Sequence, residues 1–229
     1  MKKLENISLK ETVTPVVIPA YSLDKFSPHI FSTDMAKPED ISLEDVVLSS
    51  TAVPVYFDPH SFELSKGQRS NFSDGGLAAN NPALLALGEA MKLYGIQPDN
   101  NNYLVLSIGT GRPKLPEAPS QHHGALIYWL TPLNGVMPRL IDLLFNSMSD
   151  MVDIYMARIF RGRDNYLRIQ EYALENSLNS IDAASAVTLG KLKEVGKKLI
   201  DHNVSTIDPE TGEIKELPDQ TNRDALIKY

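Results

Sequence analysis

The sequence predicts an α/β domain built around a mainly parallel sheet that is covered on both faces. The first observation is the continuous apolar run Tyr103-Leu-Val-Leu-Ser-Ile108, which follows a segment with helical periodicity. Apolar strands that alternate with helices are typical of doubly covered parallel sheets. The second is the composition of the 229 residues, 42% hydrophobic and 22% charged, which is typical of globular proteins and excludes disorder and coiled coil.

The first 60 residues predict two strands and a helix. The run Thr14-Pro-Val-Val-Ile-Pro-Ala20 is β-branched and bounded by prolines, which indicates a buried strand, and residues 29–32 form a second candidate. Ser42-Leu-Glu-Asp45 has the pattern of a capping box at a helix start. We expect this helix to end at Pro54 and the chain to run extended afterwards.

A sharp turn and a second helix follow in the middle of the chain. Asp74-Gly-Gly76 predicts the turn, and Asn81 and Pro82 open a helix as N-cap and first helical residue. Gly95 closes this helix. One apolar face of the helix consists of Leu84, Leu87, Met91 and Tyr94.

The C-terminal half predicts a long helix, a strand and a shorter helix. Residues 133–160 form a Met-rich helical stretch, Tyr166-Leu-Arg-Ile-Gln170 a strand, and residues 184–201 an amphipathic helix. A turn is expected at Asp208-Pro-Glu-Thr-Gly212, and Asn222 caps a last short helix.

Charge and cysteine content exclude several classes of function. With 22 Lys and Arg against 29 Asp and Glu the formal net charge is −7, and no basic run indicates nucleic-acid binding. The chain has no cysteine, which removes disulfides, thiolate zinc sites and cysteine nucleophiles. No signal peptide and no run of ~18 apolar residues is present, so we expect a cytoplasmic or peripheral membrane protein.

Three ordered motifs carry a family resemblance. They are Ser49-Ser-Thr-Ala-Val-Pro-Val-Tyr-Phe57, then Asp74-Gly-Gly76 followed by Asn80-Asn-Pro82, then Leu106-Ser-Ile-Gly-Thr-Gly111. In this order they resemble the C-terminal portion of the patatin-like phospholipase and acyl hydrolase family. Two later segments, Tyr166-Leu-Arg-Ile-Gln170 and the helix near residues 182–200, also look like the end of the same domain. The resemblance covers about residues 13–201.

The resemblance implies a fold and a domain organisation. The expected fold is a three-layer α/β/α sandwich with a mainly parallel central sheet, patatin-like and missing its N-terminal strands. Residues 1–201 would form a partial patatin-like acyl hydrolase domain. Residues 202–229 would add a C-terminal turn and a short helix to the same domain.

Asp74 is the candidate catalytic residue. A carboxylate on a glycine-flanked turn can accept a proton from a nearby hydroxyl, and Gly75 and Gly76 permit positive φ and a close approach of substrate or a second loop. The resemblance implies that Asp74 acts as general base in a Ser-Asp dyad without histidine, with Gly75 and Gly76 shaping its loop. From the tripeptide alone, an Asx-turn without catalytic role is the alternative.

The sequence departs from the family at the nucleophile. No serine has glycine at both −2 and +2; Ser107 precedes Gly109 but has Val105 behind it. The Gly-x-Ser-x-Gly elbow and the glycine-rich oxyanion loop are therefore absent. We expect a portion of a lipid acyl hydrolase that carries the aspartate but no nucleophile and is inactive alone. A non-catalytic lipid-binding or regulatory module and a degenerate fragment are the alternatives.

The expected partners follow from the resemblance. They are an acyl lipid or phospholipid substrate once the domain is completed, and an N-terminal complementing segment. Peripheral membrane contact is compatible with this interpretation. Neither cofactor, nor metal, nor nucleic acid is expected.

Other patterns have simpler interpretations. His122-His123 lies among prolines and glycines without further ligands, so a solvated loop is favoured over a metal site. Gly109-Thr-Gly111 lacks the residues of a nucleotide-binding loop. For residues 133–160 a buried core helix is favoured over an acyl-chain groove, and for Arg161-Gly-Arg163 a solvated turn over a site for phosphate head groups.

Overall fold

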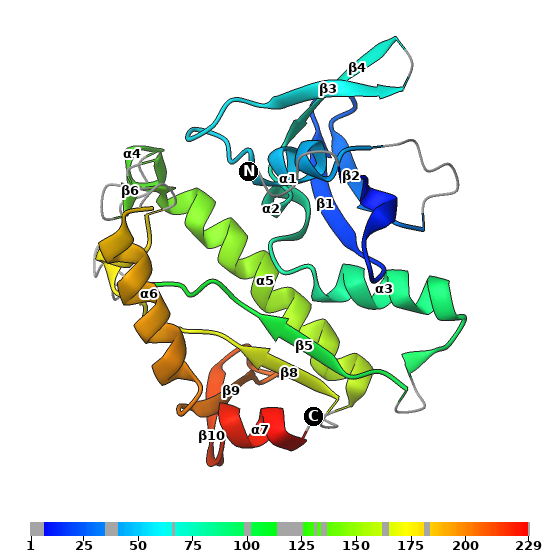
Figure 1. Ribbon diagram of the computed structural model, residues 1–229. Coiled ribbons are helices and arrows are strands. Elements are labelled where there is room, and N and C mark those ends of the chain that lie inside the picture. The colour runs from blue at the N-terminus through cyan, green and yellow to red at the C-terminus, as the bar shows by residue number, and fades with distance from the viewer. Residues whose placement is uncertain are drawn as a thin grey trace. The chain divides into compact units, whose positions relative to one another are not determined.

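A computed structural model describes most of the chain: residues 7–34, 41–65, 67–98, 102–113, 126–130, 132–133, 137–161, 165–180 and 184–228. Figure 1 shows the arrangement of its helices and strands. The chain forms two compact units, Met1–Ile96 and Gln97–Tyr229. Each unit has its own strand pairings and core and is described by itself.

The first unit contains a four-stranded sheet in the order β2-β1-β4-β3 (Figure 1). All of its pairings are antiparallel, which differs from the mainly parallel sheet expected from the sequence. The reason is the short connections: four residues join β1 to β2 and two join β3 to β4, whereas a parallel pair needs a crossover of a dozen residues or more. The strands are β1 Val17–Ser22, β2 Ser27–Ser32, β3 His60–Ser65 and β4 Gln68–Ser73.

Three α-helices accompany this sheet among the described residues of the unit: α1 Leu43–Thr51, α2 Gly76–Ala79 and α3 Ala83–Tyr94. Ser42 caps α1 as predicted, because its Oγ accepts the N–H of Glu44 at 3.1 Å. Asp45, the expected partner in the capping box, lies 2.8 Å from His60 Nε2 instead. A 3-10 turn at Leu9–Glu11 precedes β1.

The core of the first unit is aromatic. Phe31 on β2 and Phe72 on β4 are almost fully buried, with ring centroids 5.4 Å apart in an edge-to-face arrangement. Phe62 on β3 lies 5.5 Å from Phe72. This cluster joins three of the four strands. Its buried members are Leu9, Ala20, Phe31, Ile41, Val46 and Phe72.

The segment after α1 differs from the prediction. The helix ends at Thr51, three residues before Pro54, and the next residues form a turn rather than an extended run. The N–H groups of Tyr56 and Phe57 both donate to the carbonyl of Val53, at 3.2 and 3.0 Å. Val55 has φ of 78° within this turn, a conformation that a β-branched residue rarely adopts.

The second unit contains a parallel pair. Strand β5 (Val105–Ile108) pairs in parallel with β8 (Tyr166–Ile169), and helix α5 (Arg139–Phe160) lies between them in sequence. This part matches the predicted apolar strand and the predicted strand at residues 166–170. The other elements are α4 Leu126–Leu130, β6 Pro132–Leu133, β7 Met137–Pro138, a 3-10 turn at Asn176–Leu178 and α6 Ala186–Leu199.

The C-terminal residues contribute a hairpin that the sequence did not indicate. Strands β9 (Asn203–Ile207) and β10 (Ile214–Thr221) pair around the predicted turn, and α7 (Asn222–Lys228) follows. Pro218 lies at a register shift of β10, and most of β10 is exposed, so the strand lacks the alternating pattern of a half-buried one. The buried cluster of this region joins Leu167 and Ile169 of β8 to Val204 of β9 and Ala225 of α7.

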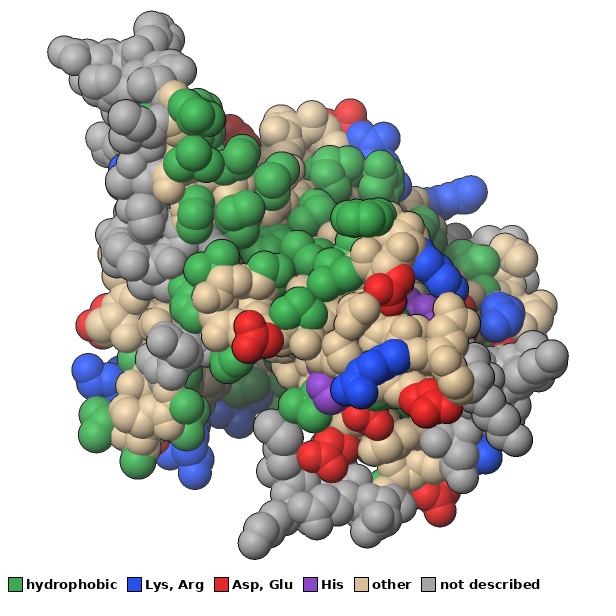
Figure 2. Space-filling model, turned by 90° about the horizontal axis from the view of Figure 1, so that it is seen from above, with side chains coloured by type: hydrophobic (Ala, Val, Ile, Leu, Met, Phe, Trp, Pro, Cys, Tyr) green, Lys and Arg blue, Asp and Glu red, His purple; other side chains and the backbone are tan. Residues whose placement is uncertain are grey.

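Helix α5 is only partly a core helix. Met156 and Phe160 are buried, as the favoured interpretation requires. Much of its apolar stripe nevertheless faces outward, namely Leu140, Leu143, Leu144, Met151 and Tyr155, each at least 37% exposed. Figure 2 shows how hydrophobic side chains gather over one face of the surface. None of the described helices is both long enough and apolar enough to cross a bilayer.

Candidate active site

The Asp74 loop lies where β4 passes into the short helix α2. The end of α1 holds it through backbone hydrogen bonds: the N–H of Asp74 donates to the carbonyl of Ala52, and that of Gly75 to the carbonyl of Ser50, both at 3.1 Å. The hydroxyl of Ser73 also donates to Ala52, at 2.9 Å. Two motifs of the family resemblance, the Ser49–Phe57 segment and the Asp74 loop, are thus in direct contact.

The two glycines are required for space rather than for positive φ. Gly75 has φ of −65° and Gly76 is the first residue of α2, so the expected left-handed conformation is wrong. The predicted close approach is present. A Cβ on Gly75 would lie 2.2 Å from the carbonyl oxygen of Pro19 and 2.9 Å from Ser50 Oγ. The loop passes so close to strand β1 that a side chain has no room.

The carboxylate of Asp74 is partly buried and held by its own loop. Its Oδ1 accepts the N–H of Gly76 at 2.5 Å. Burial raises the pKa of Asp74 above its ordinary value, and the hydrogen bond from Gly76 offsets this in part. A carboxylate with a raised pKa is a better proton acceptor than an exposed aspartate, which fits a general base. The same hydrogen bond from Gly76 is also expected if Asp74 only forms an Asx-turn and has no catalytic role.

The two asparagines after the loop differ in their surroundings. Asn81 is 2% exposed, and its Oδ1 accepts the N–H of Ala83 at 3.2 Å, which fixes the start of α3. The helix begins one residue later than predicted. Asn80 is exposed, and its Oδ1 lies 3.5 Å from the position that a Cβ on Gly76 would take.

Three serines, one beside the loop and two in the other motifs of the resemblance, are buried. Ser73 is 3% exposed and donates to the carbonyl of Ala52, while Ser49 is fully buried. Ser107 is 6% exposed and accepts a hydrogen bond from Arg168 at 2.8 Å. These contacts agree with the absence of a Gly-flanked serine in the sequence.

The other candidate segments of the sequence are described only in part. His122 and His123 fall outside the described residues, as do Gly162 and Arg163. Arg161 ends α5 in the left-handed conformation, with φ of 53°. Across the described ranges, no cluster of His, Asp and Glu side chains is arranged to hold a metal ion.

Gly109 and Gly111 are packing residues. A Cβ on Gly109 would lie 1.6 Å from Gln170 Oε1, and Gly111 has φ of 85°. The N–H of Gly111 donates to Gln170 Oε1 at 3.2 Å. This turn therefore packs against the end of β8.

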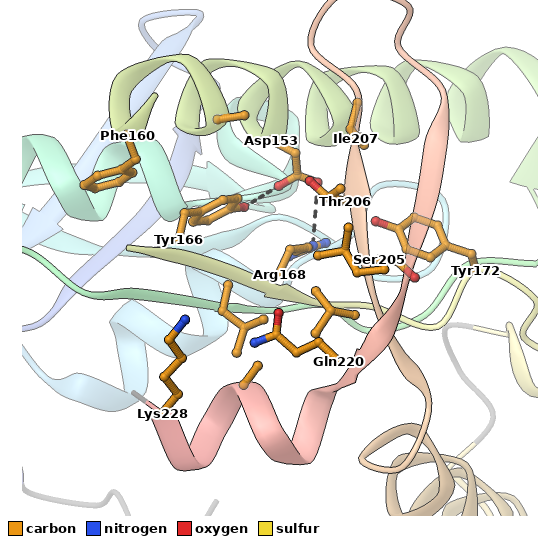
Figure 3. A pocket seen from close by; sticks show the side chains of 15 residues that line it. Asp153, Phe160, Tyr166, Arg168, Tyr172, Ser205, Thr206, Ile207, Gln220 and Lys228 are labelled. Atoms are coloured by element: carbon orange, nitrogen blue, oxygen red, sulfur yellow. Dashed lines mark hydrogen bonds and ion pairs between the residues drawn. The ribbon is translucent and has the colours of Figure 1, made fainter. Parts of the chain in front are cut away.

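Sequence reasoning missed a buried polar cluster in the second unit (Figure 3). Asp153 on α5 is 5% exposed, accepts the hydroxyl of Tyr166 and lies 3.7 Å from Arg168 Nε. The sequence contained only a weak signal, Arg168 within an apolar strand, because Asp153 is one of several charged residues in the Met-rich stretch. The pairing depends on the packing of α5 against β8.

Comparison with known proteins gives consistent similarities. A sequence model described as patatin-like phospholipase matches residues 2–87, which include the Asp74 loop. Patatin-like protein 2 from Arabidopsis thaliana is 35% identical, over 99% of this chain and 60% of that protein.

Two further patatin-like or patatin relatives show similar identity and coverage. Patatin-like protein 2 from Oryza sativa subsp. indica is 33% identical over 100% of this chain and 62% of its own length. Patatin-2-Kuras 4 from Solanum tuberosum is 33% identical over 93% of this chain and 61% of its own length. The chain thus spans about three fifths of the length of the curated relatives it matches.

Proposed function

Because this chain belongs to the patatin-like phospholipase family, we propose that it carries the general-base portion of a lipid acyl hydrolase. Asp74 is the base, and the nucleophilic serine comes from a segment outside these 229 residues. The observation that carries the proposal is the Asp74 loop itself: a partly buried carboxylate of raised pKa, fixed by the end of α1 and by strand β1.

The proposed reaction is ester hydrolysis in two steps. The serine hydroxyl attacks the carbonyl carbon of an acyl lipid or phospholipid while Asp74 accepts its proton. The alcohol portion then leaves with that proton, and an acyl-serine remains. Water attacks the acyl-serine, again losing its proton to Asp74, and the serine takes this proton back as the fatty acid departs. No cofactor or metal enters these steps.

Complementation tests the assignment. The 229-residue chain is mixed with, or fused to, the segment of a patatin-like relative that carries the family's oxyanion loop and Gly-x-Ser-x-Gly elbow. Hydrolysis of a nitrophenyl ester should appear only in the combined protein. A fluorophosphonate probe should label the elbow serine and no serine of this chain.

Asp74→Asn is the decisive variant. Asparagine keeps an oxygen that can accept the N–H of Gly76 but cannot accept the serine proton. A positioned base contributes ~10²–10⁴-fold, so the restored rate should fall by about that factor. Asp58→Asn is the matched control, because Asp58 is an exposed carboxylate outside the loop. If Asp74→Asn stays within about threefold of the active parent, Asp74 is only a turn residue.

A second candidate function, a non-catalytic lipid-binding module, has its own support. Leu126, Trp129 and Leu130 on α4 are exposed together with the outward stripe of α5. Sedimentation with uncharged phosphatidylcholine vesicles tests this candidate. Binding by the chain alone, combined with no hydrolysis after complementation, would favour it over the catalytic proposal.

A further inference from the structure

The second unit contains a cavity of about 280 Å³ that the proposed reaction does not use. It is lined from α5, β8, the β9–β10 hairpin and α7 (Figure 3). One part of its wall is apolar: Ala157, Phe160, Leu167, Val204, Ile207 and Leu217. The other part is polar and includes one carboxylate: Asp153, Tyr166, Arg168, Tyr172, Ser205, Thr206, Gln220 and Lys228.

Arg168 is the buried cation of this wall. Its side chain is only 10% exposed, and it donates one hydrogen bond to Ser107 Oγ at 2.8 Å. Its buried Nε has no hydrogen-bond acceptor in the described part of the chain, since Asp153 Oδ2 is 3.7 Å away. The ion pair with Asp153 thus leaves the Arg168 guanidinium with donor capacity that the described chain does not use, on a side chain that lines the cavity.

The other polar groups favour an anion. Burial is the main cause that raises the pKa of Tyr172 to about 12, so its hydroxyl stays protonated and can donate. Lys228 adds a second positive charge, and Ser205, Thr206 and Gln220 carry further donors. The carboxylate of Asp153 already accepts from Tyr166 and faces Arg168. The lining therefore has two cationic side chains, Arg168 and Lys228, against one carboxylate, Asp153.

The volume of the cavity and its apolar wall restrict the class of ligand that can bind there. At ~30 Å³ for each water, the cavity has room for about nine waters, or for a compound of roughly ten non-hydrogen atoms. We propose that the cavity binds a medium-chain carboxylate such as octanoate, with its carboxylate toward Arg168 and its chain against the apolar wall. A free inorganic phosphate would leave that wall without a partner.

Calorimetric titration of the 229-residue chain with sodium octanoate, below its micellar concentration at pH 7.5, tests the proposal. We expect saturable binding of one octanoate, and no saturable binding of octan-1-ol or inorganic phosphate. Octan-1-ol that binds as tightly as octanoate would overturn the role of the charge. Phosphate that competes with octanoate would overturn the carboxylate class.

Three variants test whether octanoate binds in this cavity. Arg168→Gln removes a charge-assisted hydrogen bond and should weaken octanoate binding by about 10- to 100-fold. Ala157→Phe fills the cavity without removing a polar group and should abolish binding. Arg223→Gln is the control, because Arg223 is an exposed arginine of the same unit that pairs with Asp201. The affinity of this variant for octanoate should be unchanged.

Circular dichroism checks that each variant folds. Should Arg168→Gln fail to fold, Ala157→Phe decides the question alone. Octanoate binding that survives Ala157→Phe, or that changes less than twofold in folded Arg168→Gln, would place the ligand outside this cavity and overturn the proposal.

Discussion

Substituting alanine for Gly75 tests whether the Asp74 loop is fixed by close packing. The native φ of −65° is favourable for alanine, so backbone conformation adds no penalty. The new methyl group would lie 2.2 Å from the carbonyl oxygen of Pro19, a backbone atom of strand β1, and 2.9 Å from Ser50 Oγ. Neither distance is tolerable, so the loop or the strand must move.

The expected cost is that of overpacking a well-packed interior, about 1–3 kcal/mol of unfolding free energy. For a unit of this size, each kcal/mol lowers the melting temperature by roughly 4–8 °C. Urea and thermal unfolding followed by far-ultraviolet circular dichroism measure both quantities.

Gly88→Ala is the matched control for this experiment. Gly88 lies in helix α3 of the same unit, and a Cβ there would meet no atom within 4 Å. The alanine should therefore stabilise the unit by about 0.5–1 kcal/mol through its higher helix propensity. A Gly75→Ala protein within about 0.5 kcal/mol of the parent, an effect typical of surface substitutions, would refute the packing argument.

Three further predictions follow from the same structure. Because burial raises the pKa of Asp74, the parent should lose stability as pH rises from about 3.8 through the folded pKa. The melting temperature of Asp74→Asn should therefore equal that of the parent at pH 3 and be higher than that of the parent at pH 7. Equal melting temperatures at both pH values would contradict the raised pKa. Phe72→Ala should cost about 3–5 kcal/mol in urea unfolding, because Phe72 is 1% exposed and contacts two other core rings; a loss below about 1 kcal/mol would argue against the aromatic core. Ile108 on β5 is 71% exposed, so the folded chain should bind a hydrophobic dye. Ile108→Thr should reduce the fluorescence of the bound dye without lowering the melting temperature of the protein. Unchanged dye fluorescence would exclude β5 from the dye-binding surface.

Much of the local structure could be predicted from the sequence, because its signals act over a few residues. The cap of α1 at Ser42 and the left-handed Gly95 after α3 both occur where predicted. The apolar strands β5 and β8 were also correctly placed, and their pairing is the parallel one expected. The motif order indicated the family that the comparisons identify.

The direction of strand pairing in the first unit could not be obtained in the same way. Strands β3 and β4 are partly polar, so neither has a strong hydrophobic pattern of its own, and only their pairing around Gly67 makes them a hairpin. The hairpin of β9 and β10 was missed for the same reason. Such strands are stabilised by their neighbours rather than by local preference.

For the candidate site, the sequence determined which residues carry the chemistry, and the tertiary structure decided what surrounds them. The Asp-Gly-Gly sequence predicted a tight turn with an accessible carboxylate. Two properties of this turn depend on strands and helices distant in sequence. Pro19 leaves no room for a side chain at position 75, and burial raises the pKa of Asp74. The cavity beside Arg168 depends on them still more, since α5, β8, β9, β10 and α7 all contribute to its wall. Burial and close approach are properties of packed elements, so no pattern within a single segment specifies them.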